Sequence, residues 1–120
     1  MSRGRPADLD ALAQAIFSAW SRETASVYSE TERSRGQCSV TALAVLHHLG
    51  GRILKTPTAG GMHFYNELDG ERVDLTASQF ATPVDYADLP STPEQAMADT
   101  SPEQVAALLK GVHTYRQNAR

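Results

Sequence analysis

The sequence predicts an α+β domain in which a central helix, carrying the only cysteine, packs on a small antiparallel β-sheet. Three observations lead to this prediction. An amphipathic pattern covers residues 8–20, an almost continuous apolar run covers residues 38–49, and two β-compatible runs flank Asp69-Gly70. With 120 residues, the chain suits a single domain spanning 1–120. Its ends, at about 1–7 and 114–120, are expected to be flexible.

The first two predicted helices differ in how much of their surface is apolar. In the first, apolar residues recur at the i, i+3, i+4, i+7 spacing from Leu9 to Trp20, so one face is expected to be buried. The second begins at about Gln37 or Cys38 and ends at Gly50-Gly51. Because apolar residues wrap most of its circumference, the second helix is expected to be surrounded by the core.

The predicted sheet comes from the middle of the chain. Arg52 to Thr56 alternates in polarity between a glycine and a proline, which is typical of a strand. Met62 to Thr76 contains two further strands joined by Asp69-Gly70, a dipeptide that favours two-residue hairpin turns. The predicted order is therefore a helix followed by an antiparallel sheet.

Two more helices are expected after the sheet. Residues 91–95 and 100–104 each combine a capping hydroxyl, a proline and an acidic residue just inside, which is the pattern of a helix start. The first of these helices is expected to be short, and the second is expected to end at about Val112.

Composition and charge exclude several classes of function. The chain has 11 Lys and Arg against 14 Asp and Glu, a net charge of −3, which leaves no basic surface typical of a nucleic-acid partner. No segment approaches membrane-spanning length, and acidic residues interrupt the apolar stretch that a signal peptide would need. We therefore expect a cytoplasmic protein with neither a membrane nor a nucleic-acid partner. A single cysteine cannot form an internal disulfide or a cysteine-rich zinc site.

The hairpin places two residues with catalytic potential on one face. Pairing across Asp69-Gly70 sets Tyr65 opposite Asp74, so that His63 and Asp74 become diagonal neighbours. A carboxylate beside a histidine fixes the tautomer and the orientation of the ring, and it favours the imidazolium that a thiolate partner requires.

Cys38 is the candidate nucleophile for this pair. At a helix N-terminus, free backbone N–H groups and the positive end of the helix favour the thiolate and could also stabilise an oxyanion. Cys38, His63 and Asp74 would then be nucleophile, base and orienting group, and Gln37 and Gln79 are candidate oxyanion or substrate-binding donors. Each residue also has an ordinary structural explanation, since free cysteines are often buried and inert and Gln37 is as well explained by a structural role.

Two further observations limit the alternatives. His47 and His48 lie in the last turn of the helix that Cys38 begins, about 14 Å away at 1.5 Å rise per residue, so no common metal site is expected. No cofactor is expected either. Asn66, between apolar neighbours on the opposite hairpin face, is most simply a buried, hydrogen-bonded amide.

Part of the sequence resembles a known family. GQCSVTALAVLHHLGGRILKT at residues 36–56, followed by HFYN, DG and VDLTASQF, resembles the YunG-like proteins of bacteria, from about Trp20 to Phe80. More distantly, the order of helix cysteine, strand histidine and strand aspartate is similar to transglutaminase-like and papain-like cysteine enzymes. That similarity implies a papain-like or transglutaminase-like core and acyl chemistry on amides or thioesters.

The function favoured by these residues is a cysteine-dependent, amide-directed hydrolase, deamidase or acyltransferase. Its partner would be a peptide, a protein or a small amide or thioester substrate. The alternative is a non-catalytic binding module that keeps the same fold and uses the cleft for a peptide or a small molecule. The reactivity of the Cys38 thiol distinguishes the two hypotheses.

Overall fold

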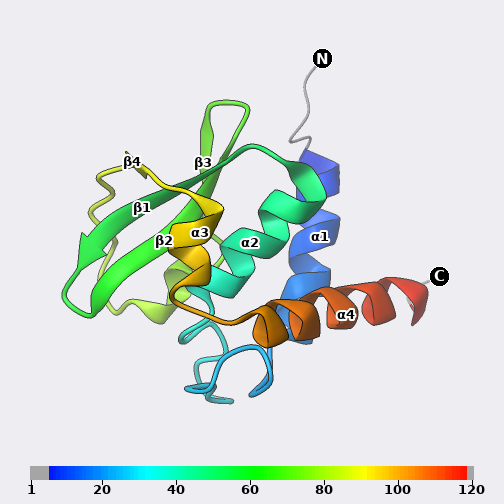
Figure 1. Ribbon diagram of the computed structural model, residues 1–120. Helices are drawn as coiled ribbons and strands as arrows, with labels where there is room; N and C mark the ends of the chain where they lie inside the picture. The colour runs from blue at the N-terminus through cyan, green and yellow to red at the C-terminus, as the bar shows by residue number, and fades with distance from the viewer. Residues whose placement is uncertain (1–5, 119–120) are drawn as a thin grey trace.

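The computed structural model describes residues 6–118 and confirms the α+β prediction. The sheet is antiparallel, with four strands in the order β3-β2-β1-β4 (Figure 1). The elements are, in chain order, α1 (Pro6–Ala19), α2 (Cys38–Leu49), β1 (Arg52–Thr58), β2 (Gly61–Leu68), β3 (Glu71–Val73), the 3₁₀ helix η1 (Ala77–Gln79), β4 (Leu89–Pro90), α3 (Pro93–Met97) and α4 (Pro102–Asn118).

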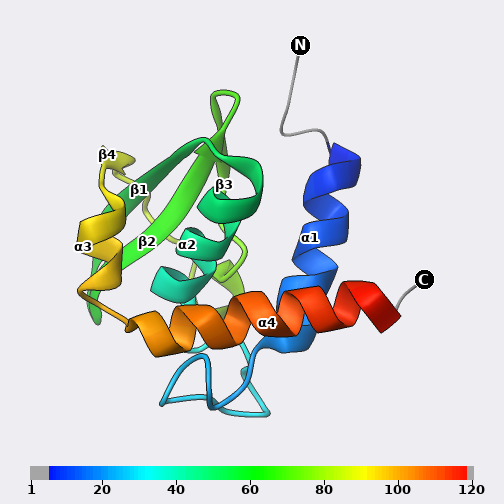
Figure 2. The same ribbon diagram turned by 45° about the vertical axis from the view of Figure 1, so that its right-hand side comes forward.

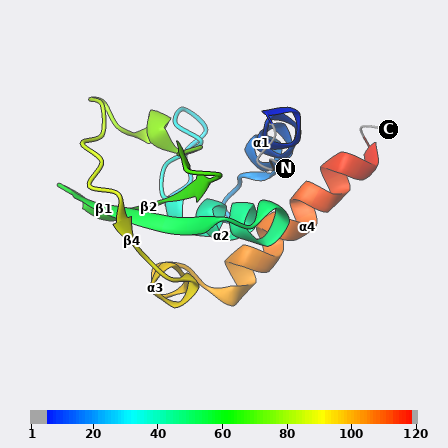
Figure 3. The same cartoon turned by 90° about the horizontal axis from the view of Figure 1, so that it is seen from above.

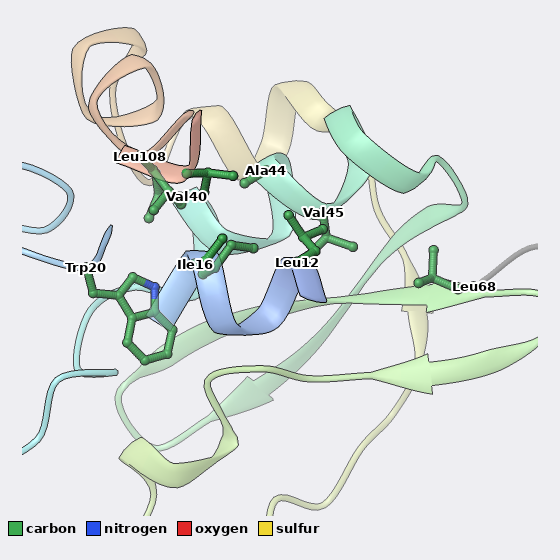
Figure 4. Close-up of a cluster of buried hydrophobic side chains, with 10 residues drawn as sticks. Leu12, Ile16, Trp20, Val40, Ala44, Val45, Leu68 and Leu108 are labelled. Carbon is green, nitrogen blue, oxygen red and sulfur yellow. The ribbon is translucent and has the colours of Figure 1, made fainter. Parts of the chain in front are cut away.

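The helix α2 lies between the sheet on one side and α1 and α4 on the other (Figures 1 and 2). Its environment agrees with the apolar residues that wrap most of its circumference, and residues 39–45 are all buried. The first hydrophobic cluster joins α1, α2 and α4 and includes Leu68 of β2 (Figure 4). Its fully or nearly fully buried members are Leu12, Ala15, Ile16, Trp20, Val40, Ala44, Val45, Leu68, Leu108 and Val112.

A second, smaller cluster joins α2 to the sheet and to α3. Ala42 and Leu43 of α2 contact Ile53, Phe64 and Ala96 there. The opposite face of the sheet is covered by residues 74–88, which include η1 (Figure 3). The strand β2 is therefore covered on both faces, and it carries a run of buried residues from 63 to 66 instead of an alternating pattern.

The β2–β3 hairpin has the predicted register. Leu68 pairs with Glu71 across a turn in which Asp69 and Gly70 have φ values of 53° and 81°. Positive φ at both central positions is what a type I′ turn requires, and glycine and aspartate adopt it at low cost. Asn66 points to α2, where its side-chain amide donates to the carbonyl of Ala42 at 3.0 Å. The prediction of a buried, hydrogen-bonded amide at this position is confirmed.

The third strand is shorter than predicted. It ends at Val73, so Asp74 and Thr76 do not pair with Tyr65 and His63 in the sheet. Asp74 Oδ1 instead accepts hydrogen bonds from the backbone N–H and the hydroxyl of Thr76, at 3.1 and 3.3 Å. Because an aspartate that bonds the backbone two residues on forms a turn, the chain leaves the ladder here and continues into η1.

The C-terminal half of the chain follows the predicted helix starts, but its last helix is longer than predicted. Hydroxyls of Thr92 and Ser101 cap α3 and α4, each accepting from a backbone N–H three residues on. α4 continues to Asn118, past the predicted end near Val112. The expected flexibility of the chain ends falls partly on residues 1–5 and 119–120, which lie outside the described part of the structure.

The short edge strand β4 was not predicted. It pairs Leu89 and Pro90 with β1, and proline is tolerated at a sheet edge because its missing N–H costs no ladder hydrogen bond there. Within residues 6–118, no helix is long and apolar enough to cross a membrane.

Candidate active site

A cavity of about 240 Å³ lies where α2 begins, beside the β1–β2 turn and η1. The Cys38 and His63 side chains both line it, and Asp74 stands behind His63. The other lining residues come from the segment before α2, the β1–β2 turn, η1 and the end of α3: they are Gly36, Thr58, Gly60, Gly61, Met62, Gln79, Phe80 and Asp99.

His63 and Asp74 form a buried pair at the base of the cavity. The Nε2 atom of His63 donates to Asp74 Oδ2 at 2.7 Å, and the two side chains are only 2% and 5% exposed. The pairing foreseen from the hairpin therefore occurs, although β3 ends one residue before Asp74. The edge of Phe80 meets the His63 ring at a centroid distance of 4.8 Å and limits its rotation.

The Asp74 carboxylate is held by more donors than His63 alone. Tyr86 donates its hydroxyl to Oδ2 at 2.7 Å, while Thr76 bonds Oδ1. Burial by itself raises the pKa of Asp74. This effect is outweighed by the hydrogen bonds from His63 and Tyr86, the charge of His63 and the hydrogen bond from the Thr76 N–H. The pKa of Asp74 therefore lies below its ordinary value. Asp74 is therefore ionised at neutral pH.

His63 is correspondingly stabilised in its protonated form. Burial lowers the pKa of His63, but the hydrogen bond to Asp74, interaction with Cys38 and the charges of both partners raise it to about 9. Cys38 is therefore within interaction range of the ring. Among residues 6–118, the Nδ1 atom of His63 makes no hydrogen bond, and Cys38 is the neighbour, besides Asp74, that raises the pKa of the ring.

Cys38 occupies the first position of α2 and is half-buried. Its Sγ atom lies 3.8 Å from the Ser39 hydroxyl. The N-cap residue makes no side-chain hydrogen bond to the first turn of α2, so the N-terminal amides are not satisfied by a capping side chain. A thiol, an imidazole and a helix start without a side-chain cap thus meet at one cavity.

Residues 8–117, nearly the whole of the described chain, match the family model described as "YunG protein". The chain belongs to the YunG family. The "Uncharacterized protein YunG" of Bacillus subtilis (strain 168) is 45% identical over 85 residues, which cover 71% of this chain and 74% of that protein. No solved structure matches the chain.

The two glutamines predicted from the sequence have different places in this YunG-family site. Gln79 lines the cavity, where its Oε1 accepts from the Gly36 N–H at 3.4 Å and its Nε2 donates to the Thr76 carbonyl at 3.2 Å. Gln37 does not line the cavity. Its side chain is fully buried, and its Oε1 accepts from the Thr24 hydroxyl at 2.8 Å, which ties the preceding loop to α2.

Sequence reasoning missed the groups that hold Asp74 and Tyr86 in place. Arg72 pairs with Asp88 through two hydrogen bonds of 2.8 and 2.5 Å, and its guanidinium lies 4.2 Å from the centre of the Tyr86 ring. Tyr65 donates to Asp88 at 2.9 Å. Tyr86 and Asp88 lie in an irregular segment without periodicity, so only their aromatic and acidic character could have drawn attention to them.

The histidines at the other end of α2 take no part in this YunG-family site. His47 and His48 pack edge to face with ring centroids 5.0 Å apart, in the last turn of the helix. Among residues 6–118, no group of three or more His, Cys, Asp or Glu side chains is placed to hold a metal ion.

Proposed function

We propose that Cys38, His63 and Asp74 form the catalytic triad of a cysteine-dependent enzyme that acts on amides or thioesters, as a hydrolase, deamidase or acyltransferase. The observation that carries this proposal is that the two ring nitrogens of His63 have different surroundings. Its Nε2 atom is fixed by a buried, ionised carboxylate, and its Nδ1 atom is left without a hydrogen bond beside the cavity that Cys38 lines. The proposal includes a papain-like or transglutaminase-like core, in which a cysteine at a helix start faces a histidine and an aspartate from the sheet side.

The proposed reaction proceeds in two halves. The Cys38 thiolate attacks the substrate carbonyl carbon, and the resulting oxyanion is stabilised by the N-terminal amides of α2. The tetrahedral intermediate then collapses, and its C–N or C–S bond breaks while the leaving group takes the proton from His63. A pKa of about 9 suits His63 to this role, because the ring enters the reaction protonated at neutral pH.

The second half restores the enzyme. Neutral His63 removes a proton from water, or from an acceptor amine or thiol, whose heteroatom attacks the thioester on Cys38. Collapse of this second intermediate releases the acid or the transferred acyl product, the thiolate and protonated His63. Whether water or another nucleophile enters decides between hydrolysis or deamidation and acyl transfer.

The test measures the rate of Cys38 alkylation by iodoacetamide in the folded protein as a function of pH. We expect labelling below about pH 7, because an adjacent imidazolium favours the thiolate. His63→Ala should move labelling to higher pH, and Asp74→Asn should do so to a smaller extent by misorienting the ring. His113→Ala, which removes an exposed histidine from α4, is the matched control and should leave the profile unchanged.

Each variant is first shown to be folded by circular dichroism, because unfolding would expose the thiol and imitate reactivity. If the folded wild-type protein is labelled only at alkaline pH and His63→Ala changes nothing, the triad is refuted. Cys38 is then a structural residue, and the binding-module hypothesis replaces the enzyme.

A further inference from the structure

The cavity that Cys38 lines adjoins two further cavities through shared lining residues, and the three together are called the groove here. On one side it adjoins a cavity of about 250 Å³, with which it shares Thr58, Gly60 and Phe80. On the other side it adjoins a cavity of about 570 Å³, with which it shares Gly36, Gly60 and Asp99. The β1–β2 turn at Gly60 therefore borders all three cavities, and a substrate placed on the thiol has room to extend in both directions.

The two arms of the groove differ in chemistry. The smaller arm is walled by Pro57, Phe80, Pro83 and Val84, which suit an uncharged, largely apolar group. The larger arm is lined mainly by small and polar residues from the loop before α2 and from the segment joining α3 to α4. They are Thr24, Ala25, Ser26, Val27, Gly36, Gly60, Ala98, Asp99, Thr100 and Gln104.

Asp99 is the charged group of the larger arm. It also lines the central cavity, and its Oδ2 accepts a hydrogen bond of 2.6 Å from Ser39, the residue after Cys38. This bond fixes the carboxylate at the rim of the site. Asp85 borders the smaller arm, and no lysine or arginine is among the residues that line the three cavities. The groove thus carries two carboxylates and neither lysine nor arginine, and the charge of the His63 imidazolium in its lining is paired with Asp74.

We propose that the substrate of this site carries a cationic group, an ammonium or a guanidinium, which binds Asp99 in the larger arm while an uncharged group fills the smaller arm. The inference rests on the proposed function, because it assigns the substrate class of the same Cys38 site. Anionic substrates are disfavoured at both ends of the groove.

The experiment uses three thiol reagents that differ in charge: aminoethyl, sulfonatoethyl and methyl methanethiosulfonate. Each reacts with the Cys38 thiolate, which forms a disulfide with the thio group and displaces methanesulfinate. The measured quantity is the ratio of the second-order rate constants for the cationic and the anionic reagent. This ratio cancels any change in the fraction of thiolate, so a mutation that merely alters the reactivity of the thiol leaves it unchanged.

We expect the ratio to favour the cationic reagent in the wild-type protein and to fall about fivefold to tenfold in Asp99→Asn at low ionic strength. Asparagine keeps an oxygen to accept the Ser39 hydroxyl, so the local structure is conserved. The difference should shrink at about 0.5 M salt, because the charges are then screened. Glu71→Gln removes the same charge at the far end of the hairpin and should leave the ratio as it is in the wild-type protein.

The neutral methyl reagent separates two kinds of failure. If it reacts readily in a His63-dependent manner while Asp99→Asn leaves the ratio unchanged, the cationic substrate is refuted and the triad stands. If it does not react with the folded protein, the triad is refuted and the substrate inference with it.

Discussion

His63 is enclosed by groups that act in opposite directions on its charge. The Tyr65 ring stacks on it at a centroid distance of 5.6 Å, and the Phe80 edge meets it from another side, so the ring is largely removed from water. Desolvation of this kind disfavours an imidazolium. The Asp74 carboxylate and Cys38 overcome that cost, which is why the pKa of His63 rises to about 9 in spite of burial.

The raised pKa makes the stability of the protein depend on pH in a defined window. Because the pKa of His63 is about 9 in the folded protein and 6.5 for an ordinary histidine, its stabilising contribution is complete below about pH 6.5 and is lost as the pH rises toward 9. We predict that the difference in unfolding free energy between the wild-type protein and His63→Gln decreases across this window. Urea unfolding followed by circular dichroism measures it.

Cys38 also contributes to the raised pKa of His63, so its part needs a separate control. The comparison is therefore repeated with Cys38→Ser in both proteins, where Asp74 still raises the pKa of His63. A difference that stays constant between pH 6.5 and 9 in both backgrounds would show that His63 is not stabilised in its charged form.

At the scale of elements, residues 81–88 position the site although they form no helix or strand. The segment is fastened to the sheet by the Arg72–Asp88 pair and by two backbone donors. The N–H of Ala87 bonds the Thr56 hydroxyl, and the N–H of Asp88 bonds the Tyr65 hydroxyl, both at 2.9 Å. Asp88 has a φ of 53°, a conformation that few side chains adopt without compensating contacts. These contacts keep the segment on the sheet, in the position from which Tyr86 reaches Asp74.

We predict that Arg72→Met loosens this segment without unfolding the protein. The variant loses the two hydrogen bonds to Asp88 and the contact of the guanidinium with Tyr86. Hydrogen exchange of the amides in residues 81–88 should therefore become faster. Arg52→Met removes an ion pair with Glu67 between β1 and β2 and should leave exchange in this segment unchanged. Equal exchange rates in both variants would contradict the prediction.

Periodic elements were predictable from the sequence, and the irregular segments were not. α2 follows from its apolar run, and the hairpin register follows from Asp69-Gly70, because both patterns depend on neighbouring residues. The side-by-side placement of His63 and Asp74 followed from alternation along the strands, even though β3 is short. Tyr86 and Asp99 reach the site through long-range packing of irregular chain, for which the sequence holds no period.

Gln37, a candidate oxyanion donor by sequence, is buried and does not line the cavity. Its Oε1 bonds Thr24, and its Nε2 has no hydrogen-bond partner among residues 6–118. Gln79, which is far from Cys38 in sequence, reaches the cavity because η1 turns the chain back toward α2.

For the molecule as a whole, α2 is common to both hydrophobic clusters. Val40, Ala44 and Val45 belong to the cluster with α1 and α4, whereas Ala42 and Leu43 belong to the cluster with the sheet and α3. If α2 moves away from one cluster, apolar surface of both clusters becomes exposed. The two clusters are therefore expected to unfold together in one cooperative transition.

The two clusters can be followed separately during unfolding, because the one tryptophan of the chain, Trp20, lies in the first cluster and Phe64 lies in the second. We predict that urea unfolding followed by Trp20 fluorescence and by pulsed hydrogen exchange of the Phe64 amide gives coincident midpoints. Separate midpoints would mean that the two clusters unfold independently. With coincident midpoints, a mutation in α1 or α4, remote from the thiol, lowers the population of molecules in which Cys38, His63 and Asp74 lie together as effectively as a mutation beside the thiol.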